Sequence, residues 1–391
     1  MTAVGGVAVY VTTPAGNKHH GSAESKETST SPAPTKAKTK TKATPTSVLP
    51  PLRPDGTVAD GRPPQFVDVS FDGSGNLDLL RHWLQVGQRS HARFSFFLSG
   101  VYLLDAAHKD RYVGPHHRPG ASAVGFANVP AGMTTQQYMS ALTGRLNLAR
   151  QSGNEVGTHF NGHFCTGVAH PVGTWSSADW KNEIDQFKAL AANIAPNNGL
   201  SSPVANPLPP GGPIGGRTPC LEGNMAALYP VLVKEGFRYD ASRTGVMGQW
   251  PVKYLGLWSM TLDGIPLAGT HRHNLSMDYN LYYVYANAKP VAPKQSAQIS
   301  RRAYQSYVDY FDHSYYGNRA PIDLGNHFEH WDNSAYSDAL TRFVETECVK
   351  PEVRCVPYRD LVGWLDARSP QQLAAFQAGA FRRLVKSTAH L

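Results

Sequence analysis

From residue 65 onward, short apolar runs alternate with longer stretches of helical periodicity. The run Phe66–Phe71 is rich in β-branched and aromatic residues, and a glycine-rich break follows it at 72–76, which together predict a strand and a turn. Apolar residues then recur every three or four positions from 77 to 90, which predicts a helix. Because this order repeats along the chain, we expect a parallel sheet with helices packed against it.

The remaining predicted elements extend the same alternation. Strands are expected at 93–98, 154–157, 237–240, within 254–270, at 321–328 and at 354–357. Helices are expected at 134–152, 177–195 (with Ser177 as its N-cap), 224–236, 297–313, 335–347 and 358–365. Polar residues come directly after several strands, which is where active sites lie in (β/α) barrels. We therefore expect one α/β domain of barrel type rather than two domains.

The first 62 residues differ from the rest in composition. Residues 1–11 are small and apolar, but too few to span a bilayer, which needs about 20 residues. They are expected to be the trailing half of a membrane anchor or signal, with a plain disordered N-terminus as the alternative. Residues 12–62 are rich in Ser, Thr, Pro, Lys and Ala, which favours a flexible spacer. The expected division is a disordered segment at 1–62, a folded barrel at 63–368 and a C-terminal helix or tail at 369–391.

Charge and cysteine content narrow the choice of partners and compartment. The chain has a net charge of +8, and six lysines against two glutamates within the first 50 residues account for +4 of it. The remainder is only mildly basic, which argues against nucleic acid and suits an anionic envelope polymer or membrane surface near the N-terminus. Four cysteines, an even number, favour disulfides in an exported protein, with free buried thiols as the alternative. A monomer is expected.

Two histidines stand four residues apart in the stretch Gly153–Phe164. His159 and His163 project onto one face if the segment turns like a helix. Two neutral imidazoles in that arrangement can share a divalent ion. With 16 histidines in the chain, some such spacings arise by chance, so the pair needs partners elsewhere.

Such partners follow other predicted strands. In chain order the segments are Ser70-Phe71-Asp72-Gly73, His159-Phe160-Asn161-Gly162-His163, Gly216-Arg217-Thr218-Pro219, Tyr239-Asp240-Ala241-Ser242 and Leu324-Gly325-Asn326-His327. Together they resemble the motifs of the polysaccharide deacetylase (NodB homology) family of metal-dependent carbohydrate esterases, over about residues 65–365. The resemblance implies a distorted (β/α) barrel that removes N- or O-acetyl groups from a polymer of the cell envelope or extracellular space.

The resemblance also implies acid and base roles. Asp72 would be the base that deprotonates the attacking water, and Arg217 would orient it by a charge-assisted hydrogen bond. His327 would protonate the leaving amine or alkoxide, with Asp240 holding the imidazole cationic and oriented. This is a consistent set for hydrolysis, because one group generates the nucleophile and another supplies the proton.

The implied metal site departs from the family pattern. His159 and His163 would hold a divalent ion, zinc first, with cobalt, nickel or manganese as alternatives. The family's second aspartate, normally the third ligand, is Gly73 here, and two neutral histidines bind less firmly than two histidines with a carboxylate. Three alternatives stay open for the third position: Asp72 itself, one of Ser74, Asn76 or a water, or no metal at all.

Gly73 keeps a second function open, in which the same barrel grips an acetylated glycan without hydrolysing it. A stretch from Met277 to Tyr283 could line a sugar groove or form a buried edge strand, and His271, His273 and His330 are expected to be surface or groove residues. No G-x-S-x-G elbow or Gly-rich phosphate loop occurs.

The implied mechanism brings the metal loop and the arginine loop to one rim. We therefore predict a disulfide between Cys165 and Cys220, which leaves Cys348 and Cys355 as a local pair.

Overall fold

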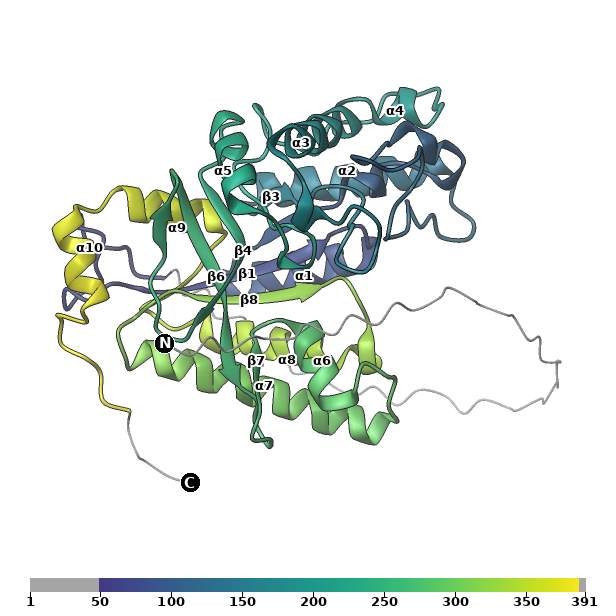
Figure 1. Ribbon diagram of the computed structural model, residues 1–391. Helices are drawn as coiled ribbons and strands as arrows, with labels where there is room; N and C mark the ends of the chain where they lie inside the picture. Colours follow the sequence, from purple (N-terminus) through teal and green to yellow (C-terminus); the bar gives the residue numbers. More distant parts are fainter. Residues whose placement is uncertain (1–48, 387–391) are drawn as a thin grey trace, which may run out of the picture. The chain divides into compact units, whose positions relative to one another are not determined.

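A parallel sheet forms the centre of the computed structural model, which describes residues 49–386 (Figure 1). Its strands, in spatial order, are β3 (Glu155–Thr158), β2 (Ser95–Leu98), β1 (Gln65–Gly73) and β8 (Ile322–His327), and β9 (Val353–Cys355) pairs with the start of β1. In the register of this sheet, Asp72 lies beside Phe97 of β2 and His327 of β8. The C-terminal ends of β1 and β8 therefore bring a carboxylate and an imidazole side by side.

A second sheet contains β4 (Tyr239–Val246), β6 (Leu257–Pro266), β5 (Val252–Tyr254) and β7 (His273–Leu275). Strands β4 and β6 are parallel, whereas β5 and β7 run antiparallel to β6. Isolated bridges join the first sheet to two segments outside the named strands, between Thr158 and Gly216 and between Met277 and Gly325. Backbone hydrogen bonds from Ala241 to Gly216 (2.9 Å) and from Ser276 to Asp263 (2.9 Å) complete the connection. The predicted α/β fold is confirmed, and these bonds link its strands into an irregular ring.

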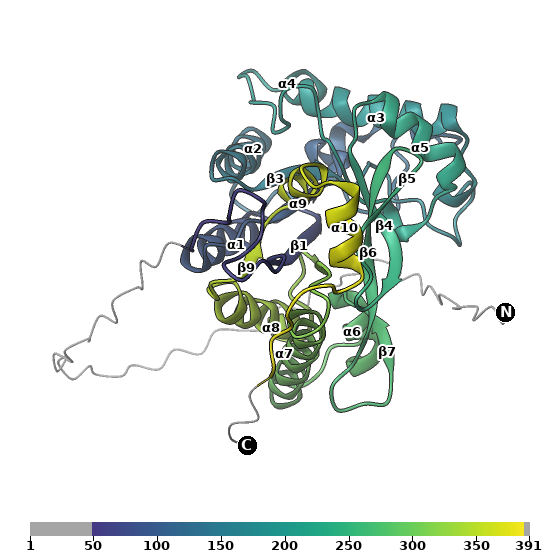
Figure 2. The same ribbon diagram turned by 90° about the vertical axis from the view of Figure 1, so that its left-hand side faces the viewer.

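Helices surround this ring. They are α1 (Leu77–Ser90), α2 (Thr135–Gln151), α3 (Ser177–Ala192), α4 (Ile194–Asn197), α5 (Met225–Lys234), α6 (Asp278–Ala286), α7 (Pro293–Tyr315), α8 (Trp331–Glu347), α9 (Tyr358–Asp366) and α10 (Pro370–Gln377). Figure 2 shows α1, α2, α3, α7 and α8 on the outside of the strands, with α9 and α10 in front of them near the start of β1. In the part of the chain that the structure describes, none of these helices is both long and apolar enough to cross a membrane.

The alternation of side chains along β1 separates an apolar shell from a polar interior. Val67, Val69 and Phe71 pack into the core with residues of α1 and α8. On the opposite face, Asp68, Ser70 and Asp72 are polar, and Ser70 and Asp72 accept hydrogen bonds from Arg217 inside the ring. Since successive side chains of a strand point to opposite faces, the two-residue period fixes which residues of β1 can take part in chemistry.

Residues 49–62, which the composition assigns to a disordered segment, make defined contacts. Val58 is buried, the Trp364 indole donates a hydrogen bond to the carbonyl of Gly56 (2.9 Å), and the buried Arg62 pairs with Glu352. A few apolar and charged contacts against α9 and the turn before β9 are enough to order this stretch. The expected anchor at 1–11 and the spacer up to residue 48 lie outside the described residues.

Two local expectations differ from the structure. The N-cap of α3 is Ser176 and not Ser177, because Ser176 forms a reciprocal capping box with Asp179. The stretch 278–286 is the helix α6, so the alternative of a buried edge strand there is wrong. Of the aromatic residues on this helix, Tyr279 is exposed and Tyr282 is buried.

Candidate functional site

Asp72 stands at the C-terminal end of β1 with its side chain buried against Arg217. The Arg217 Nη1 donates a hydrogen bond of 2.9 Å to Asp72 Oδ1, and both side chains are almost inaccessible to solvent. Burial alone would raise the pKa of the Asp72 carboxyl, but Arg217, His159 and His327 outweigh it and hold that pKa below its usual range. Asp72 is therefore ionised at neutral pH and held in one orientation.

The remaining N–H groups of Arg217 donate hydrogen bonds to acceptors inside the ring of strands. Its Nε donates to the carbonyl of Ala241 (2.8 Å), and its two terminal nitrogens also reach Ser70 Oγ (2.8 Å) and the Tyr358 hydroxyl (3.1 Å). Asp323 lies 3.5 Å away, and burial raises the pKa of that carboxyl to about 7. Asp72, at 2.9 Å, is therefore the nearer carboxyl partner of Arg217, and the raised pKa of Asp323 makes that residue the weaker anion of the two.

His159 follows β3 directly, and its ring is buried. Its Nδ1 lies 2.9 Å from the backbone oxygen of Arg217. Since a carbonyl oxygen can only accept, Nδ1 carries the hydrogen and Nε2 keeps its lone pair. Burial lowers the pKa of His159, against the opposing effect of Asp72, so the ring is neutral at pH 7. Histidines that bind metals are commonly held in this way by a carbonyl behind them.

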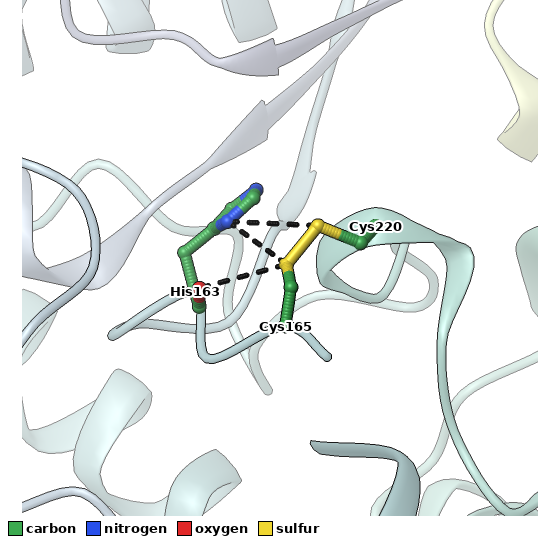
Figure 3. Close-up of side chains that lie close together, drawn as sticks. All are labelled: His163, Cys165 and Cys220. Carbon is green, nitrogen blue, oxygen red and sulfur yellow. Dashed lines mark hydrogen bonds between the residues drawn. A yellow bond between two sulfur atoms is a disulfide. The ribbon is translucent and has the colours of Figure 1, made fainter. Parts of the chain in front are cut away.

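His163 faces the same site from the loop after His159. Its backbone adopts a left-handed φ of 56°, and the two imidazole centroids are 5.1 Å apart. Figure 3 shows the Nδ1 of His163 directed at the disulfide, 3.4 Å from Cys165 Sγ and 4.0 Å from Cys220 Sγ. Burial, assisted by His159, lowers the pKa of His163 to about 3. Both imidazole rings are therefore neutral at physiological pH and can offer a nitrogen lone pair to a metal ion.

Both predicted disulfides are confirmed. Cys165 and Cys220 are bonded with a Cα separation of 6.0 Å, which ties the histidine loop to the loop that carries Arg217. Cys348 and Cys355 are bonded with a Cα separation of 5.5 Å, joining the end of α8 to β9.

His327 takes its orientation from Asp278, a residue for which the sequence suggested no catalytic role. The Nδ1 of His327 is 2.7 Å from Asp278 Oδ1, and the backbone nitrogen of His327 donates to Asp278 Oδ2 (2.8 Å). Burial would lower the pKa of His327, but Asp278 and, less strongly, Asp72 raise it above its usual value. The bridge between Met277 and Gly325 sets Asp278 beside this histidine.

The expectation that Asp240 holds His327 is wrong. Asp240 is buried on β4, where it accepts hydrogen bonds from Ser242 Oγ (2.5 Å) and the Tyr229 hydroxyl (2.8 Å). Ser242 in turn accepts from the backbone nitrogen of Thr218, next to Arg217 (2.8 Å). Asp240 therefore supports the loop that carries the arginine, because the first strand of the second sheet places it beside that loop.

The side chains of Ser74 and Asn76, which were candidates for the third metal ligand, are engaged in other hydrogen bonds. Ser74 Oγ donates to the carbonyl of Phe71 (2.9 Å), and the Asn76 side chain caps α1. Gly73 itself has a φ of 92°, which favours glycine, and a Cβ there would lie 3.3 Å from the ring of Tyr102. The Tyr102 ring thus lies in the space that a side chain at position 73 would enter.

The donor set fits a divalent ion through its two histidines. His159 and His163 offer neutral nitrogen atoms, which suit zinc and related ions. Asp72 is near enough to influence the pKa values of both histidines, although one of its oxygens is bonded to Arg217. Within residues 49–386, the one group of three donors whose ligand atoms all lie within 4.8 Å is His163 with the two disulfide sulfurs. Asp72, His159 and His163 do not form such a group among these residues, so the arrangement supports the two histidines as the protein ligands.

A buried carboxylate supports the histidine loop from behind. Glu183 of α3 accepts hydrogen bonds from the backbone nitrogen of Asn161 (3.0 Å) and from the Tyr112 hydroxyl (2.9 Å). Tyr112 in turn accepts from the nitrogen of Gly162 (3.1 Å). This support lies 22 residues away in sequence, and no motif pointed to it.

Aromatic rings lie next to His327. The ring centroid of Trp331 is 5.4 Å from that of His327, and the partly exposed Tyr279 is 6.3 Å from it. Aromatic faces of this kind commonly pack against sugar rings. His271 and His273 are exposed, as expected, and His330 is exposed with its Nδ1 2.8 Å from Ser334 Oγ.

No family model matches the chain, and no curated protein matches its sequence. Comparison with solved structures gives matches at low identity. A protein described as a polysaccharide deacetylase from Mycobacterium smegmatis is 13% identical, with 88% of this chain and 99% of that chain covered at a TM-score of 0.46. The chitin deacetylase of Colletotrichum lindemuthianum is 14% identical, covering 79% and 90% at a TM-score of 0.39. A mutant of the peptidoglycan deacetylase PdaC from Bacillus subtilis is 13% identical, covering 80% and 96% at a TM-score of 0.38.

Proposed function

We propose that this chain is a hydrolase that removes acetyl groups from an acetylated polysaccharide of the cell envelope or extracellular space. The observation that carries the proposal is the register of β1 and β8, which sets Asp72 beside His327. Their surroundings have opposite effects: Arg217 lowers the pKa of Asp72, and Asp278 raises the pKa of His327. A carboxylate base next to a protonated imidazole is the pair that hydrolysis of an amide or ester requires.

In this proposal, each residue of the pair moves one proton. Asp72 removes a proton from the water that attacks the acetyl carbonyl, and Arg217 keeps the carboxylate ionised and oriented. His327 then gives its proton to the leaving amine or alkoxide, so that acetate and the deacetylated sugar separate. A divalent ion bound by His159 and His163 would supply a Lewis acid that polarises the carbonyl and makes the water more acidic.

A glycan-binding module without turnover is the second candidate, and Gly73 favours it. Without the second carboxylate, two neutral histidines compensate the charge of a divalent ion poorly. The rings of Tyr279 and Trp331 would serve a binding module as well as an enzyme. The two functions therefore differ in chemistry but not in the face of the barrel that meets the sugar.

Acetate release separates the two candidates. The purified chain would be incubated with acetylated chitooligosaccharides, peptidoglycan and acetylxylan, with and without a chelator and with added zinc, cobalt, nickel or manganese. A hydrolase releases acetate from at least one substrate, and the chelator abolishes the release. Binding of a polymer with no acetate under any of these conditions would favour the binding module.

The two disulfides are typical of exported proteins, so we propose that the chain acts outside the cytoplasm. The basic N-terminal segment would suit attachment near a membrane or an anionic envelope polymer. In this proposal residues 63–368 carry the activity as a monomer.

A further inference from the structure

The ring of His163, which belongs to the proposed active site, also contacts both sulfur atoms of the disulfide between Cys165 and Cys220. Its Nδ1 is 3.4 Å from Cys165 Sγ and 4.0 Å from Cys220 Sγ, and the three ligand atoms lie within 4.8 Å of one another (Figure 3). A disulfide sulfur carries no hydrogen, so Nδ1 must be the donor in the contact with Cys165. In the oxidised chain the disulfide therefore holds His163 as the tautomer whose Nε2 lone pair is available to a metal.

These distances also match a zinc site of a different kind. With Zn–S distances of about 2.3 Å and Zn–N distances of about 2.0–2.1 Å, a nitrogen and a sulfur ligand of a tetrahedral site lie about 3.6 Å apart. The two observed nitrogen–sulfur distances, 3.4 Å and 4.0 Å, lie on either side of this value. Two sulfur ligands of such a site lie about 3.8 Å apart, so the two sulfurs must separate once their bond is broken before both can bind one ion.

The two disulfides differ in how easily a reductant can reach them. Cys165 and Cys220 are partly exposed, whereas Cys348 and Cys355 are 1% and 3% exposed. Because thiol–disulfide exchange requires access to a sulfur atom, a dithiol reductant should attack the first pair before the second.

We propose that His163, Cys165 and Cys220 form a zinc site that the disulfide controls. A dithiol reductant supplies two electrons and two protons, which convert the disulfide into two thiols. The reductant itself is oxidised to an internal disulfide. Zinc then binds both sulfurs and the Nδ1 of His163, and the two thiol protons are released to solvent. The hydrogen of Nδ1 moves to Nε2, so His163 no longer offers a lone pair beside His159. The last step rests on the proposed function, because it removes one ligand from the hydrolytic site.

Cobalt is the probe that tests this site without any activity measurement. The full chain is treated with a limiting amount of dithiothreitol, freed of the reductant without oxygen, and its thiols are counted and mapped by alkylation and mass spectrometry. We expect thiols at Cys165 and Cys220 while the buried pair stays bonded. Added Co²⁺ should give the near-ultraviolet absorption of sulfur-to-cobalt charge transfer, zinc should bleach it, and the oxidised chain should not give it.

Two variants separate the ligands from their neighbours. His163→Ala should weaken cobalt binding by more than the roughly 10- to 100-fold typical of losing a ligand's hydrogen-bond partner, because it removes a ligand. His159→Ala is the matched control and should leave the absorption unchanged. Cys348→Ser with Cys355→Ser should also retain it, and if that variant does not fold, the alkylation map of the wild type identifies the pair.

Free thiols at Cys165 and Cys220 without the cobalt absorption would overturn the proposal. An affinity for cobalt in His163→Ala equal to that of the wild type would also overturn it. If the chain hydrolyses acetyl groups, zinc added to the reduced form should also suppress acetate release. The cobalt result does not depend on acetate, so failure of the hydrolase proposal would leave it standing.

Discussion

Replacing Asp278 by Asn removes the charge behind His327 while keeping the size of the side chain. In the native chain, Asp278 accepts hydrogen bonds from both the ring and the backbone nitrogen of His327. An amide keeps one acceptor oxygen and replaces the other with an NH₂ donor, so at least one of the two bonds loses its acceptor. The imidazolium form of His327 then loses its anionic partner.

The magnitude follows from the burial and length of this bond. The hydrogen bond is 2.7 Å long, and Asp278 is only 2% exposed. A hydrogen bond to a charged group contributes about 1.5–3 kcal/mol, and each 1.36 kcal/mol is a factor of ten. At pH 7, acetate release should therefore fall by up to roughly 10- to 150-fold, because the fraction of the ring that carries the proton to be donated falls by at most this factor.

The loss should depend on pH in a defined direction. Asp278 raises the pKa of His327, so removing it lowers that pKa, and the deficit in acetate release should shrink as the pH is lowered. A histidine whose pKa is raised on folding also stabilises the folded chain. This stabilisation is full when the pH is below the pKa of the unfolded state, and it is lost as the pH rises through the pKa of the folded state. Asp278→Asn should therefore lose more stability in acid than at alkaline pH.

Acetate release between about pH 5 and pH 9, with NMR titration of the His327 ring, measures both effects. Asp240→Asn is the matched control, because Asp240 is also 2% exposed but bonds to Ser242 and Tyr229. It should leave the titration of His327 unchanged. The reasoning is refuted if Asp278→Asn leaves both rate and titration unaltered, or if Asp240→Asn lowers the pKa of His327 instead.

Two further substitutions test the surroundings of the site. Gly73→Asp should destabilise the chain by about 1–3 kcal/mol, measured by thermal unfolding, because φ is 92° and the Tyr102 ring is 3.3 Å from the new Cβ. It should gain zinc affinity by calorimetry only when combined with Tyr102→Ala, and tighter binding by the single variant would contradict the role given to this ring. Glu183→Gln tests the support of the histidine loop, since burial raises the pKa of Glu183 to about 7. The stabilisation from that raised pKa is full below pH 4.5 and is lost as the pH rises through about 7. When the pH is raised from about 5 to about 8, the melting temperature of the wild type should therefore fall by more than that of the variant.

The elements that depend on local patterns could be predicted from the sequence. The helix over 77–90 begins and ends as predicted, since its apolar period and the Asn76 cap are both local signals. Asp72, His159, Arg217 and His327 lie near one another because each stands at the end of, or directly after, a strand or strand-like segment of the same ring. The disulfide between the two loops follows from the same placement.

The partners that depend on tertiary contacts could not be predicted. Asp278 and His327 are 49 residues apart, and the single bridge between Met277 and Gly325 brings them together. Similarly, no spacing in the sequence relates Tyr102 to Gly73 or Glu183 to Asn161. The motif resemblance predicts Asp240 beside His327 because the segment Tyr239–Ser242 matches a motif, and a match of this kind does not show which buried carboxylate contacts the histidine.

Asp72→Asn, assayed for bound zinc and for acetate release in the same sample, tests the central claim most directly. The substitution removes the base but leaves both histidines, so the chain should keep about one zinc ion. Acetate release should fall by about 10²–10⁴-fold, the usual contribution of a general base. Loss of zinc together with turnover would make Asp72 a ligand. Unchanged acetate release in both Asp72→Asn and His159→Ala would contradict the assignment of this site.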